Sequence, residues 1–266
     1  MNQPVFRTQH DHIGDLVIPC VDVADGRATE PSGIAGLDDP EDVAAIVAAY
    51  AGGNARKVFL DVFDPWDAID YLPPLLRDLK ELGVRPLVSV GHGDLPSVVH
   101  AGGLLEAGAD ALSVSTSLIE KPGTVEAAVR EFGAERLMGV INCRRTGPGQ
   151  WGAFTHDGAQ DTGTSAVDVA RQLAKLRVGA ILANSVDREG TGRGFDLELF
   201  HAIATTSGLP VIASGGCGDL DHLHQALSAG DVTYVLVNKM LHKGQYRIDE
   251  VRDHLLEHSS FGDAGG

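Results

Sequence analysis

The sequence alternates along most of its length between short apolar runs and amphipathic stretches with a helical period. Continuous apolar runs are typical of strands buried on both faces, and helices between them imply parallel pairing. Eight evenly spaced runs in 266 residues fit a closed (β/α)8 barrel better than the alternative, a doubly wound open sheet. The predicted strands are 16–23, 57–62, 86–90, 111–115, 137–142, 180–184, 210–214 and 234–238.

An internal repeat supports this prediction. The segments PLVSVGHGDL (86–95) and PVIASGGCGDL (210–220) share a proline, an apolar run, a glycine cluster and an Asp-Leu helix start, four strands apart. The first and fifth strands also correspond, with Asp22 and Asn142 at equivalent positions. We predict two similar half-barrels in a single domain over residues 1–266, with flexible ends at about 1–15 and 258–266.

Composition excludes several classes of function. A formal charge of −16 repels phosphate backbones and anionic lipid, so we expect neither nucleic acid nor a membrane as partner. Three cysteines without CxxC spacing indicate reduced thiols and a cytoplasmic protein. They show no metal-ligand spacing, and we expect neither a metal nor a cofactor.

Two glycine clusters are candidate phosphate sites. Ser214, Gly215 and Gly216 lie between a strand and a helix, where backbone amides can surround an anion. The alternative is a tight turn that uses glycine for its positive φ. The repeat partner, with Gly91, His92 and Gly93 (91–93), is a second candidate. Two anion sites across the barrel mouth would suit a substrate with a phosphate at each end.

Carboxylates at strand ends are candidate acids and bases. Asp22 and Asp61 end the first two strands, and Glu189 lies in the sixth connection. The long glycine-rich connection after the fifth strand is predicted to be a covering loop, with Trp151 and His156 as exposed candidates for substrate cover or for packing within the loop.

The segments VIPCVDVADGR, VFLDV, AGADALSVST, LANSVDREGTGRGFDLEL and PVIASGGCGDLDHL resemble the cyclase subunit of imidazole glycerol phosphate synthase, from about residue 16 to about 257. The related isomerase of histidine biosynthesis is a poorer match. The resemblance implies a (β/α)8 barrel that binds a substrate with two phosphates and receives ammonia from a glutaminase partner.

Carried over by position, the resemblance makes Asp22 the first catalytic aspartate and places Asn142 where the second would stand. Asp61 and Glu189 match two further acidic positions. Residues 91–93, or a register shifted by one, match the family's glycine run. The expected substrate or phosphate contacts are Gly91, His92, Gly93, Ser115, Thr116, Asn184, Ser214, Gly215, Gly216, Asn238 and Lys239.

Two departures redirect the functional expectation. An amide has no accessible pKa, so Asn142 can orient a substrate but cannot carry its proton. The charged positions where ammonia enters the family's barrel fall here on Leu16, Arg56, Ala111 and Ala180, which weakens the expectation of a glutaminase partner. Three hypotheses stay open: altered cyclase or lyase chemistry on a phosphorylated ribosyl or sugar-derived substrate, which we favour; the ordinary cyclase with a substituted proton donor; and a non-catalytic binding subunit.

Overall fold

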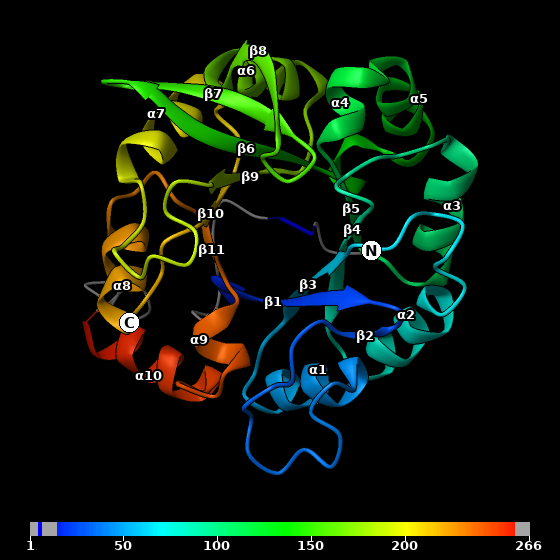
Figure 1. Cartoon of the computed structure of the whole chain (residues 1–266), viewed down its shortest axis with the longest axis vertical. Coiled ribbons are helices and arrows are strands. Elements are labelled where there is room, and N and C mark those ends of the chain that lie inside the picture. Colours follow the sequence, from blue (N-terminus) through cyan, green and yellow to red (C-terminus); the bar gives the residue numbers. More distant parts are fainter. Residues whose placement is uncertain (1–4, 7–14, 259–266) are drawn as a thin grey trace, which may run out of the picture.

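Eight parallel strands close into a barrel in the computed structural model, which describes residues 5–6 and 15–258 (Figure 1). Each strand pairs with the next, and pairing of β11 with β1 completes the circle. The predicted fold is therefore confirmed. The barrel strands are β1 (Val17–Ala24), β3 (Lys57–Val62), β4 (Arg85–Val90), β5 (Ala111–Val114), β6 (Leu137–Gly147), β9 (Ala180–Ser185), β10 (Val211–Ser214) and β11 (Tyr234–Val237).

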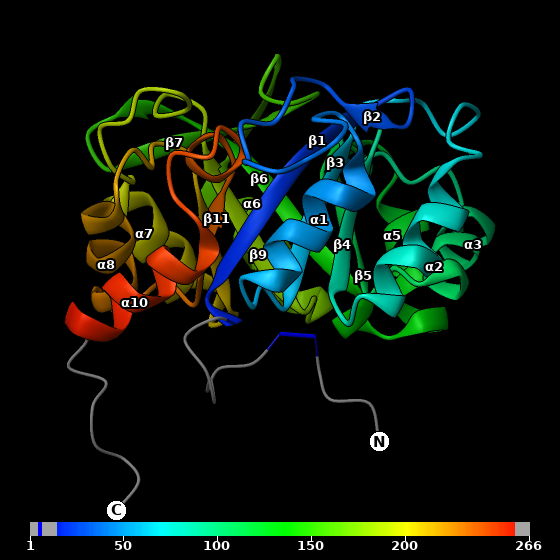
Figure 2. The same ribbon diagram turned by 90° about the horizontal axis from the view of Figure 1, so that it is seen from below.

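Helices surround the barrel and cover its outer face (Figures 1 and 2). Their apolar faces and the outward-facing strand residues form the larger of two hydrophobic clusters. None of the helices in the described part of the chain is long and apolar enough to cross a membrane. The helices are α1 (Val43–Gly52), α2 (Leu72–Glu81), α3 (Val98–Ala107), α4 (Thr116–Glu120), α5 (Pro122–Phe132), the 3-10 turn η2 (Ala134–Arg136), α6 (Ala166–Leu176), α7 (Leu197–Ser207), α8 (Leu220–Ser228), α9 (Lys239–His242) and α10 (Ile248–His258).

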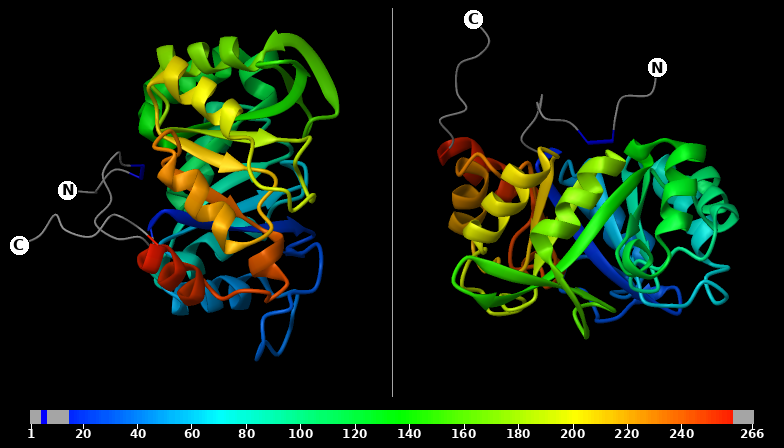
Figure 3. Two further views of the ribbon diagram at one scale, coloured as in Figure 1. Left: turned by 90° about the vertical axis from the view of Figure 1, so that its left-hand side faces the viewer. Right: turned by 90° about the horizontal axis from the view of Figure 1, so that it is seen from above.

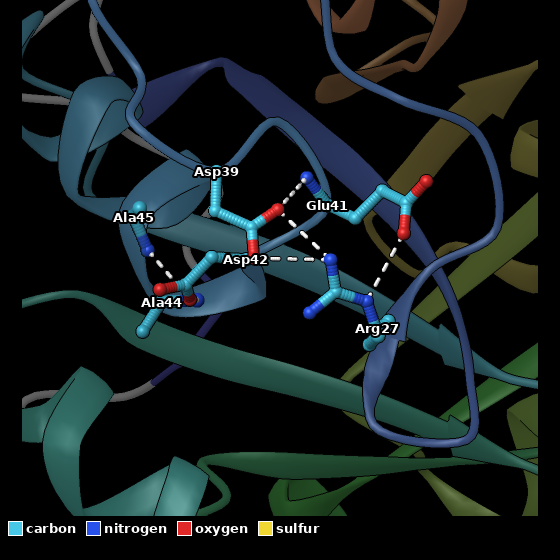
Figure 4. A network of polar contacts seen from close by, with 6 residues as sticks. All are labelled: Arg27, Asp39, Glu41, Asp42, Ala44 and Ala45. Atoms are coloured by element: carbon cyan, nitrogen blue, oxygen red, sulfur yellow. Dashed lines mark hydrogen bonds and ion pairs between the residues drawn. The ribbon is translucent and has the colours of Figure 1, made fainter.

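The first connection shows how local sequence defines an element. Arg27, in the short strand β2 (Arg27–Ala28), donates to Asp39 and Glu41 across the loop that leads to α1 (Figure 4). Asp42 then accepts hydrogen bonds from the Ala44 and Ala45 amides and begins the helix. An acidic N-cap satisfies otherwise unpaired amides and suits the positive end of the helix dipole.

The second hydrophobic cluster fills the inside of the barrel. The Phe6 ring packs edge-on against Tyr234 at a centroid distance of 6.0 Å, and a β-carbon on Gly179 would lie 2.7 Å from the Phe6 ring. The barrel is thus a packed core below its mouth rather than an open channel. The members of this cluster are Val5, Phe6, Ile18, Cys20, Phe59, Leu87, Ala111, Met138, Ala180, Leu182, Ile212 and Tyr234.

The connection after the fifth barrel strand differs from its prediction. Strand β6 continues past the barrel and pairs antiparallel with β7 (Gln150–Thr155), which pairs with β8 (Gln160–Ser165). Figure 3 shows this ribbon, in green, at the side of the barrel. The prediction of a loop was wrong because Pro148 and Gly149, with φ of 64° at the glycine, form a hairpin turn between two strands. The ends predicted to be flexible, at about 1–15 and 258–266, lie mostly outside the residues that the structure describes.

Candidate active site

A ring of eight polar side chains surrounds the mouth of the barrel. Each barrel strand contributes one inward-facing residue near the carboxyl end of the part that forms the barrel, the side where barrel enzymes hold their catalytic groups. The ring lines a cavity of about 410 Å³, large enough for a sugar phosphate. Its members, in strand order, are Asp22, Asp61, Ser89, Ser115, Asn142, Asn184, Ser214 and Asn238.

Two carboxylates occupy adjacent positions in the ring. Asp22 of β1 and Asp61 of β3 are register partners on neighbouring strands, so their side chains lie on the same face of the sheet. The Asn238 amide donates to Asp22 Oδ2 at 2.8 Å, and the Cys20 thiol lies 3.5 Å from Asp22 Oδ1. Asp22 is therefore held in place by two hydrogen-bond donors.

The environment of Asp61 raises the pKa of its carboxyl group. Burial is the main cause that raises its pKa, to about 8, and the nearby carboxylates of Asp157, Asp22 and Glu189 raise it further. A hydrogen bond with Ser89 lowers the pKa, but less than burial raises it. At neutral pH Asp61 is thus a protonated acid beside the carboxylate Asp22, and the pair can both give and take a proton.

Amides occupy the opposite half of the ring. Asn142 of β6 and Asn184 of β9 are register partners, and Asn184 Nδ2 donates to Asn142 Oδ1 at 2.9 Å. The same Nδ2 donates to Glu189 Oε1 at 3.0 Å. The two hydrogen bonds from Nδ2 fix the orientation of the Asn184 side chain. They also keep the Asn142 oxygen directed toward Asn184. The Asn142 NH2 group therefore remains as a donor for a ligand.

The glycine-rich connection after β10 borders the same cavity. Gly215 and Gly216 have φ of 89° and 105°. A β-carbon on Gly215 would lie 2.5 Å from the carbonyl oxygen of Ser185, at the end of β9, and one on Gly216 would lie 2.2 Å from that of Gly194. Glycine is thus required here for backbone packing, the alternative that the sequence left open. Lys239 also lines the cavity, and its Nζ would lie 3.4 Å from a β-carbon on Gly190. Lys239 and the glycine backbone can together hold an anion.

The tip of the β7–β8 hairpin reaches the cavity on the β4 side. Asp157 lines the cavity, and its carboxylate is hydrogen-bonded to Nδ1 of His92 in the β4–α3 connection. The Phe63 ring stacks on the His92 ring at a centroid distance of 6.4 Å. The amide of His156 donates to Thr116 Oγ1 at 3.3 Å. The ribbon is therefore attached to the mouth at two points.

Most of the predicted site residues lie together at the mouth, and three do not line the cavity. Gly91 and Gly93 form the turn that carries His92, and a β-carbon on Gly93 would lie 2.8 Å from Ser115 N. Thr116 donates to the carbonyl of His92 at 3.0 Å. Gly91, Gly93 and Thr116 therefore hold the β4–α3 connection in place. The predicted residues that line the cavity are Asp22, Asp61, His92, Ser115, Asn142, Asn184, Glu189, Ser214, Gly215, Gly216, Asn238 and Lys239.

Sequence reasoning missed Ser89 and Asp157. Ser89 could have been found by aligning the two repeats from their shared Asp-Leu end, which matches it with Ser214; alignment from the proline does not. Asp157 reaches the cavity only because the hairpin folds over the mouth. Trp151 was predicted to be exposed, but it is 4% exposed and its Nε1 donates to Asp196, so it anchors the ribbon instead.

Three further sets of residues lie outside the polar ring. Arg145 pairs with Asp196 and with Glu198 and therefore does not serve the cavity. Burial raises the pKa of the three thiols, so Cys20, Cys143 and Cys217 are kept as thiols. Of the four positions expected at an ammonia entrance, Leu16, Ala111 and Ala180 are buried and Arg56 is exposed.

The chain was compared with known protein families. Residues 16–247 match the family model described as histidine biosynthesis protein. The match covers all eight barrel strands and therefore every member of the polar ring.

Proposed function

Because the chain belongs to the histidine biosynthesis protein family, whose members are barrel isomerases and cyclases, we propose that it is an enzyme that moves protons on a phosphorylated ribosyl or sugar-derived substrate. The chemistry proposed is of the cyclase or lyase type and altered from that of imidazole glycerol phosphate synthase. The phosphate would lie against Gly215, Gly216 and Lys239, and the reacting carbons would lie over Asp22 and Asp61.

The observation that carries the proposal is the pairing of Asp22 and Asp61. Two carboxyl groups in register, one charged and one kept protonated by burial, form a general base and a general acid in the same cavity. A non-catalytic binding subunit would have no need of an acid whose pKa is raised to about 8, because the raised pKa costs stability.

Asn142 supports a reaction that differs from the ordinary cyclase. Its NH2 group faces the cavity as a donor, because Asn184 holds its oxygen. A hydrogen-bond donor opposite a base stabilises negative charge that develops on a carbonyl oxygen or an imine nitrogen of the substrate. A carboxylate at the same position would repel that charge. We propose that Asn142 binds the reacting group and that Asp61 takes the place of the absent carboxylate as acid.

The test is turnover of the substrates of the family's isomerase and cyclase, with free ammonium supplied for the cyclase, followed by chromatography and mass spectrometry. We expect cyclase product to form about 10²–10⁴ times more slowly than with an ordinary cyclase, the usual cost of losing an acid–base partner. Turnover at the ordinary rate would show that the chain is the ordinary cyclase.

A matched variant sharpens this test. Asn142→Asp restores a carboxylate on β6 beside Asn184. If altered chemistry results from the amide, this variant gains cyclase turnover over the wild type by about tenfold or more, within the range that one acid–base group contributes. Equal cyclase turnover in both proteins would show that the amide is not what redirects the reaction.

A further inference from the structure

His242 of α9 fastens the connection between β2 and α1 (residues 29–42) to the helix that follows the last barrel strand. Its Nε2 donates to the Glu30 carbonyl at 2.8 Å, so Nε2 carries a hydrogen. Its own carbonyl accepts from the Gly33 amide at 2.8 Å and from the Ser32 hydroxyl at 2.9 Å. One residue therefore holds three residues of the connection.

The two segments meet so closely that only glycine fits between them. A β-carbon on Gly33 would lie 2.2 Å from the carbonyl oxygen of Lys243, and one on Gly244 would lie 2.3 Å from that of Gly33. The Arg27 network of Figure 4 fixes the other end of the same connection. The connection is thus a fixed wall beside the barrel mouth.

These contacts complete a closed chain of hydrogen bonds that includes the proposed base. The Thr29 amide donates to the Asp22 carbonyl at 3.0 Å, and the His242 amide donates to the Asn238 carbonyl at 2.9 Å. The Asn238 side chain in turn donates to the Asp22 carboxylate at 2.8 Å. His242 therefore links the segment that leaves Asp22 to the helix that begins after Asn238.

A buried imidazole is an unfavourable way to join two segments. His242 is 6% exposed, and its Nδ1 has no hydrogen-bond partner among the described residues. A buried polar atom without a partner lowers stability, whereas an apolar side chain could fill the same space without that loss. The histidine is therefore better explained by its neighbours: Asp22, Asn238 and Lys239 line both the main cavity and a small cavity beside His242.

We infer that His242 is a positioning residue: by locking the β2–α1 connection to α9, it holds the Asp22 carboxylate against the Asn238 amide. The inference rests on the proposed function, in which Asp22 is the general base. His242 does not line the main cavity, so it acts through these two neighbours rather than on the substrate.

The experiment compares His242→Phe, which keeps a ring but loses the Nε2 donor, with His242→Gln, whose amide supplies a donor at nearly the same place. Turnover of the substrate of the family's cyclase, with free ammonium, gives kcat and KM. We expect His242→Phe to lower kcat about tenfold, because a small misplacement of the base slows proton transfer, and to change KM less than threefold. His242→Gln should recover kcat to within about threefold of the wild type.

A double-mutant cycle shows whether His242 acts through Asn238. In an Asn238→Ala background, His242→Phe should lower kcat by less than about threefold, because the amide that it positions is already absent. Hydrogen exchange followed by mass spectrometry measures the contact without substrate. Exchange in the peptide that contains Thr29 should be faster in His242→Phe than in the wild type or in His242→Gln. His201→Phe, the same replacement at an exposed position of α7, is the control and should change neither kcat nor exchange.

Thermal melting of each variant shows that it is folded. If His242→Phe does not fold, Gly33→Ala separates the same two segments without touching the histidine and should lower kcat in the same way. Additive losses in the cycle, or a loss that His242→Gln does not restore, overturn this inference but leave the proposed function intact. Absence of turnover in the wild type overturns the proposed function itself, and with it the role of His242 in positioning a base.

Discussion

The two halves of the barrel present different chemistry from equivalent positions. The first half, β1 to β5, places Asp22, Asp61, Ser89 and Ser115 in the ring, and the second half, β6 to β11, places Asn142, Asn184, Ser214 and Asn238 there. Both halves use one backbone register, since Asp22 pairs with Asp61 as Asn142 pairs with Asn184. An amide in place of a carboxylate keeps the shape of the side chain, but it cannot take up or release a proton. Under the proposed function, the first half transfers protons, and the second half binds and orients the substrate.

A second difference lies in the connections. The second half carries the β7–β8 ribbon, anchored by Trp151 and Arg145 on Asp196, and the first half has no counterpart among the described residues. The ribbon brings a carboxylate, Asp157, across to the mouth of the first half. The acidic half thus receives part of its charge from the amide half of the chain.

The largest expected effect is on kcat, and it comes from a substitution in the first half of the barrel. Asp22→Asn should lower kcat by about 10²–10⁴, because it removes the general base. Asn142→Ala should raise KM, because it removes a donor that binds the reacting group, and should lower kcat less than Asp22→Asn does. Steady-state kinetics on the substrate identified by the turnover test measures both. If the two variants lower kcat equally, the division between the halves does not hold.

A smaller effect is expected at Glu189, which orients the amide half. Glu189→Gln replaces a charged acceptor of Asn184 with a neutral one, a loss of about 1 kcal/mol, and should raise KM roughly fivefold. The exposed Glu126→Gln is the control for the loss of one negative charge. An unchanged KM in Glu189→Gln would show that Asn184 keeps its orientation without the carboxylate.

The proposed role of Asp61 as a general acid predicts that kcat depends on pH. Asp61 must be protonated to donate, and its pKa lies at about 8, so kcat should fall as the pH rises through about 8. The profile is measured as kcat between pH 6 and 10 in wild type and in Asp61→Asn. The variant should be slower at pH 7 and should lack the decline near pH 8. A wild-type profile that stays flat to pH 9.5 contradicts the role of Asp61 as acid.

The smallest effect concerns stability. The folded protein holds a proton on Asp61 between the ordinary carboxyl pKa of about 4 and the raised value of about 8, so unfolding releases a proton in that range and stability falls as the pH rises. Asp61→Asn removes this penalty and should raise the free energy of unfolding at pH 9 by at least about 1 kcal/mol. Urea denaturation at pH 5 and pH 9 measures it. A variant less stable than wild type at pH 9 would contradict the assignment.

The barrel could be predicted from sequence because its signal is local and repeated. Eight apolar runs each had to be covered on both faces, and each predicted strand was found to within a few residues, apart from the extension of β6 to Gly147. The ribbon could not be recognised in the same way. Its strand β7 alternates around Trp151 and Ala153, but two glycine-rich turns made the whole segment read as a loop.

The sequence by itself determined the closed barrel, the half-barrel repeat and the residue types at the ends of the strands, because period and repeat are properties of the chain. Only the tertiary structure decided what those residues do. Burial and neighbouring charges raise the pKa of Asp61, Asn184 and Glu189 direct the Asn142 amide toward the cavity, and the hairpin places Asp157 beside His92. These effects arise between residues far apart in the chain, and charge and hydrogen bonding depend on distance in space rather than along the sequence.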